Sequence, residues 1–299
     1  MIKRTIYFGN PARLYKKDEQ LVVQLNDKEE TKNIPIEDIG VLLLDDPQIS
    51  ITQALLAALV ENNVALISCD STHHPIGLMM PLSSNSLQSA KFKAQIEATL
   101  PLKKQLWQQT VKAKIRNQAL HLKLLGKNEE PLEYMARQVN SGDTENFEGR
   151  AAAVYWKELF GDDFRRERNG LPPNNLLNYG YAILRAIVAR GLVSSGLLPT
   201  LGIFHRNQYN AYCLADDIME PYRPFVDKLV NEIFTEPEIN YYELTPELKR
   251  KLLGLATVDI FFKDETGPLM VGLQRTTASL CRCFEQMQRS IEYPTLYAV

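Results

Sequence analysis

The hydrophobic pattern of this chain changes once, at a short polar segment that runs from residue 81 to residue 86. Before this segment the apolar runs are short, rich in β-branched residues and separated by turn-forming residues at intervals of about ten. This pattern predicts the strands of a small β-sandwich or rolled sheet. One stretch among them, residues 52–61, is rich in Ala and Leu and predicts a helix. The runs that predict strands are residues 5–8, 21–25, 41–44, 64–68 and 76–80.

After the polar segment nearly every apolar run has helical periodicity. The chain therefore predicts an α+β fold in two domains, and its 299 residues suffice for two hydrophobic cores. We expect a small N-terminal β-sandwich-like domain at residues 1–85, followed by a larger all-helical catalytic domain at residues 86–299.

The composition excludes several classes of protein. Hydrophobic content of 45% and charged content of 23% are ordinary for a globular chain, and the formal net charge of -2 provides no overall basic field to attract nucleic acid. The cysteines form no C-x-x-C pair, so we expect free thiols in a cytoplasmic protein. No apolar run follows the basic start, which argues against a signal peptide. The most apolar window, residues 182–204, contains Arg185 and Arg190 and predicts a buried helix rather than a membrane span.

Positive charge is nevertheless concentrated in one segment, residues 87–127, which contains nine basic residues and a single acid, Glu97. An apolar stripe at helical spacing, which begins at Trp107, predicts the buried face of a long helix. Lys112, Arg116 and Lys123 project beside this stripe. Such a row is often only a solvated helix face, but its near lack of acids also suits a track for DNA phosphates.

A histidine and a group of carboxylates suggest a metal site. His205 precedes Glu220 by fifteen residues, and Asp216, Asp217 and Glu220 have helical spacing that would place the three acids on one face. Like charges so close repel, and a bound cation would neutralise them. The alternative is a solvated acidic turn closed by Pro221.

Glu148 is a further candidate ligand. Gly149 and the alanines after it remove side-chain bulk beside the acid, which would let another helix or a substrate backbone approach. The alternative is that Glu148 only stabilises the start of a helix, as an acid in the first turn often does.

The chemistry of these residues favours hard divalent cations. One imidazole and two or three carboxylates suit Mg²⁺ or Mn²⁺ better than Zn²⁺ or copper. The chain contains neither a G-x-S-x-G hydrolase elbow nor a phosphate-loop or dinucleotide fingerprint. Metal-assisted phosphoryl chemistry is the hypothesis that remains. Arg206 follows His205 directly and would bind a phosphate or pair with a carboxylate.

Three ordered stretches resemble a known family. The stretches are LPPNNLLNYGYAILR at residues 171–185, GIFHR at residues 202–206 and LADDIMEPYRPFVD at residues 214–227. They resemble the CRISPR-associated adaptation endonuclease, the integrase of the Cas-one family, and most closely the form that accompanies type II systems.

This resemblance implies a metal-dependent DNA endonuclease and integrase of antiviral defence. Such an enzyme inserts captured foreign DNA as new spacers into a CRISPR array, through attack of 3′ hydroxyl ends on the repeat. It implies that Glu148, His205 and Glu220 are both the catalytic and the metal-binding residues, with Mg²⁺ or Mn²⁺ as cofactor, and that Asp217 is a supporting acid. Members often have Asp where this chain has Glu220, and Glu keeps the charge and ligand type.

The resemblance also implies partners. The family forms homodimers through the β domain, and two dimers clamp a small dimeric companion, Cas-two, in a heterohexamer that holds double-stranded DNA. No membrane is involved. Within this assembly Lys112, Arg116, Lys123 and Arg206 are our candidate DNA-binding residues. Two alternatives stay open: a stand-alone metal-dependent nuclease of branched DNA in repair, and a DNA-binding scaffold without catalytic activity.

Overall fold

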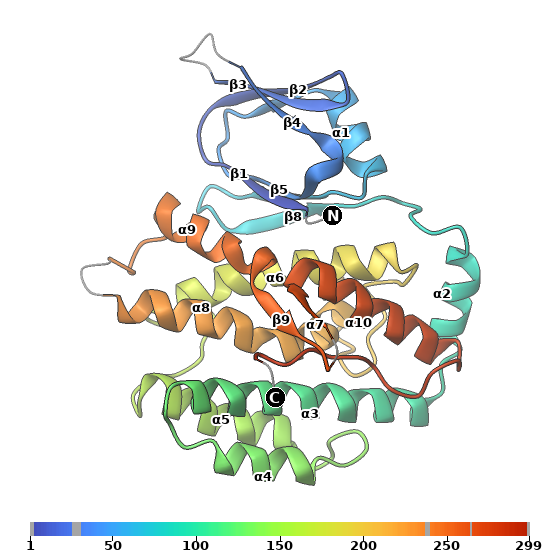
Figure 1. The fold of residues 1–299 in the computed structure, drawn as a ribbon, viewed down its shortest axis with the longest axis vertical. Helices are drawn as coiled ribbons and strands as arrows, with labels where there is room; N and C mark the ends of the chain where they lie inside the picture. Colours follow the sequence, from blue (N-terminus) through green and yellow to red (C-terminus); the bar gives the residue numbers. More distant parts are fainter. Residues whose placement is uncertain (1–2, 26–30, 237–239, 264, 298–299) are drawn as a thin grey trace. The chain divides into compact units, whose positions relative to one another are not determined.

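The computed structural model describes residues 3–25, 31–236, 240–263 and 265–297 (Figure 1). Its chain divides into two compact units, Met1–Ser86 and Leu87–Val299. Strands make up most of the first unit and helices most of the second, which is the α+β arrangement that the sequence pattern predicts.

The described residues of the first unit form two four-stranded sheets, a helix and a short 3-10 turn. One sheet has the order β1-β5-β7-β8, in which only the last pair is antiparallel. The other has the order β4-β3-β2-β6, in which only the β2–β6 pair is parallel. The elements are β1 (Arg4–Phe8), β2 (Ala12–Lys17), β3 (Gln20–Leu25), β4 (Thr31–Pro35), η1 (Ile36–Asp38), β5 (Ile39–Leu44), β6 (Ser50–Ile51), α1 (Gln53–Glu61), β7 (Ala65–Cys69) and β8 (Pro75–Met79).

One hydrophobic core serves both sheets and α1. Leu42 of β5, Leu14 and Leu21 of the other sheet, and Leu55 of α1 are all fully buried in it. A core shared by two sheets is consistent with the expected small sandwich. The parallel pairs β1–β5 and β5–β7 differ from an all-antiparallel sandwich, because each pair is joined by a long crossover: β2 to η1 lie between β1 and β5, and β6 and α1 lie between β5 and β7.

The second unit consists mainly of helices. They are α2 (Gln88–Ile96), α3 (Leu100–Leu124), α4 (Glu130–Gln138), α5 (Phe147–Phe160), α6 (Asn174–Ser194), α7 (Cys213–Met219), η2 (Glu220–Tyr222), α8 (Arg223–Thr235), α9 (Pro246–Leu253), η3 (Gly254–Thr257) and α10 (Leu269–Phe284).

The expectation of an all-helical second domain is wrong in one place. Strands β9 (Asp259–Phe261) and β10 (Thr266–Pro268) pair antiparallel, and Phe261 also bridges to Thr295 near the end of the chain. Gly267 and Pro268 disfavour a helix, and extended backbone lets Ile260 reach the core while its neighbours stay accessible.

Helices α3 and α6 supply the framework for the site. The apolar stripe on α3 is buried as predicted, with Trp107, Val111 and Ile115 at most 1% exposed. Helix α6 is the one described helix that is long and apolar enough to cross a membrane by length and composition. Since 78% of its most apolar window is buried inside the protein, it is packed as a core helix.

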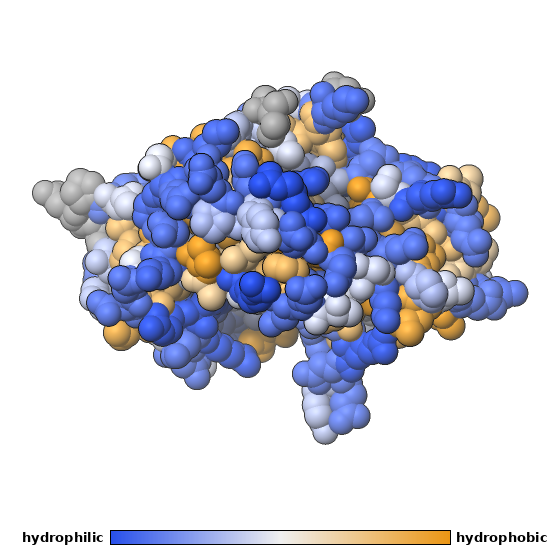
Figure 2. All heavy atoms as spheres, turned by 90° about the horizontal axis from the view of Figure 1, so that it is seen from below, coloured by the Kyte–Doolittle hydropathy of each residue, from blue (hydrophilic) through white to orange (hydrophobic). Residues whose placement is uncertain are grey.

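The face on the side of α4 and α5, shown in Figure 2, is mainly hydrophilic with small apolar groups between. Amphipathic packing of α4 explains this surface, because Leu132 and Ala136 point into the protein.

Candidate active site

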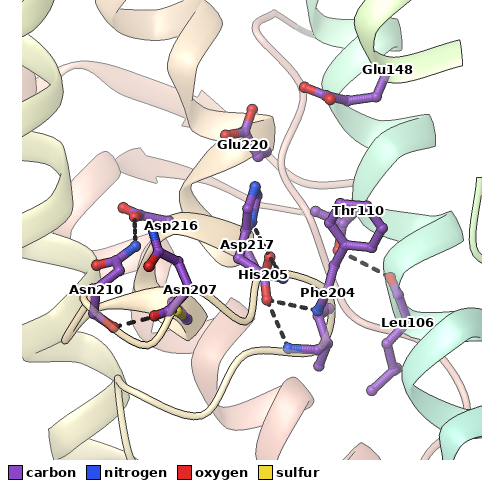
Figure 3. Close-up of polar contacts among 12 residues, drawn as sticks. Leu106, Thr110, Glu148, Phe204, His205, Asn207, Asn210, Asp216, Asp217 and Glu220 are labelled. Carbon is purple, nitrogen blue, oxygen red and sulfur yellow. Dashed lines mark hydrogen bonds and ion pairs between the residues drawn. The ribbon is translucent and has the colours of Figure 1, made fainter. Parts of the chain in front are cut away.

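Glu148, His205 and Glu220 come from separate segments that the second unit brings into one region (Figure 3). Glu148 lies in the first turn of α5, His205 in the loop before α7, and Glu220 in the η2 turn directly after α7. Helix α3 packs against both α5 and η2, so that it joins the two acidic segments.

The start of α5 is fixed by two polar side chains. The Asn146 side chain caps the helix by accepting from the Gly149 amide, and the buried Asp143 accepts hydrogen bonds from the amides of Phe147 and Glu148, each at 2.9 Å. A Cβ on Gly149 would lie 2.8 Å from Asn146 Nδ2. This glycine therefore makes room for the capping side chain, and approach of a substrate to it stays a prediction.

The loop that carries His205 is folded around Asp217. The Asp217 carboxylate accepts hydrogen bonds from the amides of Ile203 (2.7 Å), Phe204 (3.0 Å) and His205 (3.2 Å). The loop passes so close that a Cβ on Gly202 would lie 2.7 Å from Asp217 Oδ2. Glycine is thus required at this position, and the carboxylate sets the course of the loop.

Asp217 also orients the imidazole of His205. His205 Nδ1 lies 2.6 Å from Asp217 Oδ1, an arrangement that assigns the proton to Nδ1 and leaves Nε2 free to bind a ligand. The hydrogen bond to Asp217 raises the pKa of His205, whereas burial raises the pKa of the Asp217 carboxyl. Figure 3 shows the imidazole pointing toward Glu220.

Glu220 is a buried carboxylate held by two cations. Arg223 Nε donates to its Oε1 at 2.7 Å, and Lys114 Nζ lies 2.6 Å from its Oε2. Burial alone would raise the pKa of Glu220, but Arg223 and Lys114 outweigh it and lower this pKa to about 2. Although Oε2 faces the ammonium, it accepts no well-aligned hydrogen bond. A buried oxygen without a well-aligned hydrogen bond remains able to bind a cation.

Lys114 is the residue that sequence reasoning missed. Its ammonium bonds to Glu148 Oε1 as well as to Glu220, and its side chain is only 7% exposed. The sequence alone groups it with the basic residues of segment 87–127. Its position was a signal, since residue 114 follows Trp107 by seven and Val111 by three and therefore belongs to the buried face of α3.

The acids of α7 and η2 do not share one face, contrary to the expectation from their spacing. Asp216 accepts from Arg185 Nε at 2.6 Å and from Asn210 Nδ2 at 2.7 Å, while Asp217 faces the loop and Glu220 faces Lys114. The helix ends at Met219 and tightens into the 3-10 turn η2, which redirects Glu220.

The donor set fits a hard divalent cation, although no three His, Cys, Asp or Glu side chains among the described residues are already grouped around a metal position. Instead the carboxylates of Glu148 and Glu220 are gathered on the Lys114 ammonium. Two carboxylates and the Nε2 of a neutral imidazole are ligand types that suit Mg²⁺ or Mn²⁺.

The candidate DNA-binding residues lie on accessible parts of the second unit. On α3, Arg116 and Lys123 are exposed and Lys112 is half-buried, and Arg206 is exposed directly after His205. The aromatic residue Tyr181 of α6, by contrast, is buried and donates a hydrogen bond to Asp227, so it packs in the core.

Comparison with known proteins shows the family to which the sequence is similar. A family described as "CRISPR associated protein Cas1" matches residues 6–263. The CRISPR-associated endonuclease Cas1 of Neisseria meningitidis serogroup C (strain 8013) is 40% identical over 281 residues, which are 93% of this chain and 91% of that protein.

Solved structures share the fold at low sequence identity. A casposase bound to its integration product has a TM-score of 0.78 at 18% identity and covers 98% of this chain and 93% of its own. A chain of a structure described as a Cas6-RT-Cas1–Cas2 complex has a TM-score of 0.74 at 22% identity, and the match covers 96% of this chain and 35% of that chain.

Proposed function

The chain belongs to the Cas1 family of CRISPR-associated proteins, and we propose that it is the metal-dependent DNA endonuclease and integrase of CRISPR adaptation. Its substrates would be a captured double-stranded DNA fragment and a CRISPR repeat. The reaction would be a phosphodiester transesterification, in which a 3′ hydroxyl attacks the repeat backbone and one new bond replaces one old bond.

The observation that carries this proposal is the meeting of two acids from distant segments. Glu148 and Glu220 are 72 positions apart in the sequence, yet their carboxylates share one ammonium and lie in the region toward which His205 points. Acids this close cost stability unless a cation neutralises them. A site built to gather negative charge around a cation is suited to phosphoryl transfer.

Glu148, His205 and Glu220 would hold a divalent cation, with Mg²⁺ and Mn²⁺ both suitable for these donors. Such an ion, when bound, would activate a hydroxyl and neutralise charge on the phosphorus oxygens. The chain's own residues prepare the site. Asp217 keeps the proton of His205 on Nδ1, and Arg223 fixes one oxygen of Glu220 so that the other stays turned inward.

We further propose the assembly and location that the family resemblance implies. The N-terminal unit would form the homodimer, and two dimers would clamp a dimeric Cas2 protein in a heterohexamer. Support for the Cas2 partner comes from the fold shared with a complex that contains both proteins. The motifs in residues 171–227 support the type II form, and a cytoplasmic location suits its DNA substrates.

A joining assay with the purified protein, its Cas2 partner and Mn²⁺ tests the function. We expect wild type to join a DNA fragment to a repeat, and each of Glu148→Ala, His205→Ala and Glu220→Ala to abolish joining while the complex still binds DNA. The matched control is Glu145→Ala, which removes an exposed acid three residues before Glu148, outside α5. Joining by all three variants would show that the protein works without this site.

The nature of the substrate end separates an integrase from a hydrolase. A fragment with blocked 3′ ends should not be joined, because the attacking hydroxyl is missing. If the protein instead cleaves branched DNA equally well with blocked ends, a repair nuclease is the better description.

A further inference from the structure

The Lys114 ammonium lies between the two carboxylates that we propose as metal ligands. It contacts Glu148 Oε1 on one side and lies 2.6 Å from Glu220 Oε2 on the other. The two carboxylates thus share one ammonium. A cation of this chain therefore stands where ligand oxygens converge, and this arrangement rests on residues from three elements, α3, α5 and η2.

The charges of this cluster are balanced without a metal ion. Glu148 and Glu220 carry two negative charges, while Lys114 and Arg223 carry two positive charges. A divalent cation added among these four side chains would place two further positive charges beside the Lys114 ammonium. Repulsion between the ion and a neighbouring ammonium is strong where water does not screen it.

We propose that Lys114 is a built-in counter-ion, which holds Glu148 and Glu220 together in the metal-free protein and competes with the divalent cation for their inner oxygens. This inference rests on the proposed function. DNA would relieve the competition, because a backbone phosphate brings the negative charge that the ammonium can bind instead. Metal ion and DNA would thus strengthen each other's binding, and a site without DNA would hold its metal weakly.

The lysine is suited to this role by its length and position. Its backbone belongs to a 25-residue helix with a buried apolar stripe, so the anchor is rigid. Its ammonium is carried on a flexible four-carbon stem and can change partners without movement of the helix. Arg223 differs, because its guanidinium also lies 4.4 Å from the Tyr181 ring centroid and is fixed there.

Titration of Mn²⁺ into the protein without DNA, followed by calorimetry, tests the proposal. Lys114→Met and Lys114→Gln should bind Mn²⁺ at least about tenfold more tightly than wild type, because the competing charge is gone. Without metal, both variants should melt at a lower temperature than wild type. Added Mn²⁺ should raise their melting temperature by more than it raises that of wild type. Lys114→Gln keeps a hydrogen-bond donor between the two carboxylates, so that it can fold even if Lys114→Met does not.

The matched control is Lys104→Met, which removes an exposed lysine from the same helix outside the cluster and should leave Mn²⁺ affinity unchanged. A short duplex with a 3′ overhang should then tighten Mn²⁺ binding in wild type by about tenfold more than in Lys114→Gln. Unchanged or weaker Mn²⁺ binding in Lys114→Gln without DNA would overturn the counter-ion role.

The same titrations separate this inference from the proposed function. If wild type binds Mn²⁺ and Glu220→Ala does not, the metal site stands, and only the behaviour of the Lys114 variants decides the counter-ion role. If wild type binds no Mn²⁺ with or without DNA, the metal site and the counter-ion role both fail.

Discussion

Asp217 and His205 form the tightest connection between α7 and the loop before it, since Asp217 accepts hydrogen bonds from both the His205 amide and Nδ1 of its ring. Asp217→Asn should weaken Mn²⁺ binding and DNA joining by about tenfold to a hundredfold, because the amide group cannot accept from all the donors that now face the carboxylate. Calorimetric titration of Mn²⁺ and the joining assay measure the two effects.

The neighbouring acid provides the control for this prediction. Asp216→Asn removes the same charge from the same helix turn, but Asp216 pairs with Arg185 and Asn210 instead of His205. We expect Mn²⁺ affinity in this variant to stay close to that of wild type. Equal losses of Mn²⁺ affinity in Asp216→Asn and Asp217→Asn would mean that the net charge of α7, and not the orientation of the imidazole, determines metal binding.

Asn117 ties the end of the chain to the site. Its buried side-chain amide donates to the carbonyl groups of Pro221 (2.8 Å) and Pro294 (3.1 Å) and accepts from the Leu296 amide (3.2 Å). Asn117→Ala would leave these buried groups without partners and should lower the free energy of unfolding by about 3 kcal/mol. Urea denaturation followed by circular dichroism measures this loss.

Gln118→Ala is the control for Asn117→Ala. Gln118 is also a buried amide on α3, but its Oε1 accepts no hydrogen bond. The cost of its removal should be clearly smaller. If both variants lose a similar amount of unfolding free energy, the loss in Asn117→Ala comes from the packing of α3 and not from its hydrogen bonds to the C-terminal segment.

The sequence predicts much of this fold because its strongest signals are local. The apolar runs at residues 41–44 and 64–68 lie in the buried strands β5 and β7, and residues 52–61 contain α1. Strands β2 and β4 were missed, because their lysines and other polar residues hide the alternation that burial imposes. Pairing across the sheet, which no local window contains, makes them strands.

At the site, too, local sequence patterns do not predict contacts that depend on the tertiary structure. Family-like motifs predict that Glu148, His205 and Glu220 belong together, and the structure does bring the two acids to one cation. That cation, Lys114, was not predictable as their partner, because ion pairing depends on how α3 packs against α5 and η2. Nor does spacing show that Asp216 and Asp217 turn to different neighbours, since Arg185 of α6 and the loop around His205 reach them only in the folded protein.

The exposed cations of α3 should contribute to DNA capture. Arg116→Glu and Lys123→Glu each place a negative charge where we expect DNA phosphates, so both should weaken DNA binding and reduce the dependence of affinity on salt concentration. Fluorescence anisotropy of a labelled duplex at several salt concentrations measures both quantities. Arg250→Glu, an exposed reversal on α9, is the control. An unchanged salt dependence in the α3 variants would exclude this helix as the DNA surface.

A buried carboxyl beneath the site should make stability depend on pH. Asp227 accepts hydrogen bonds from Tyr181 (2.5 Å) and Tyr155 (3.1 Å), and burial raises its pKa from 3.8 to about 7. Between these two values the folded protein holds a proton that the unfolded chain has released. Stability from this group is therefore greatest at low pH and is lost as the pH rises toward 7.

Asp227→Asn tests this dependence, since its uncharged amide resembles the protonated carboxyl in shape. From about pH 4 to about pH 7 the unfolding free energy of the variant should improve relative to wild type by a few kcal/mol, at about 1.4 kcal/mol per unit of pKa difference. Urea denaturation at several pH values measures the change. Asp259→Asn, which alters an exposed carboxyl, should show a much smaller change. A pH-independent difference between Asp227→Asn and wild type would mean that Asp227 is already ionised in the folded protein.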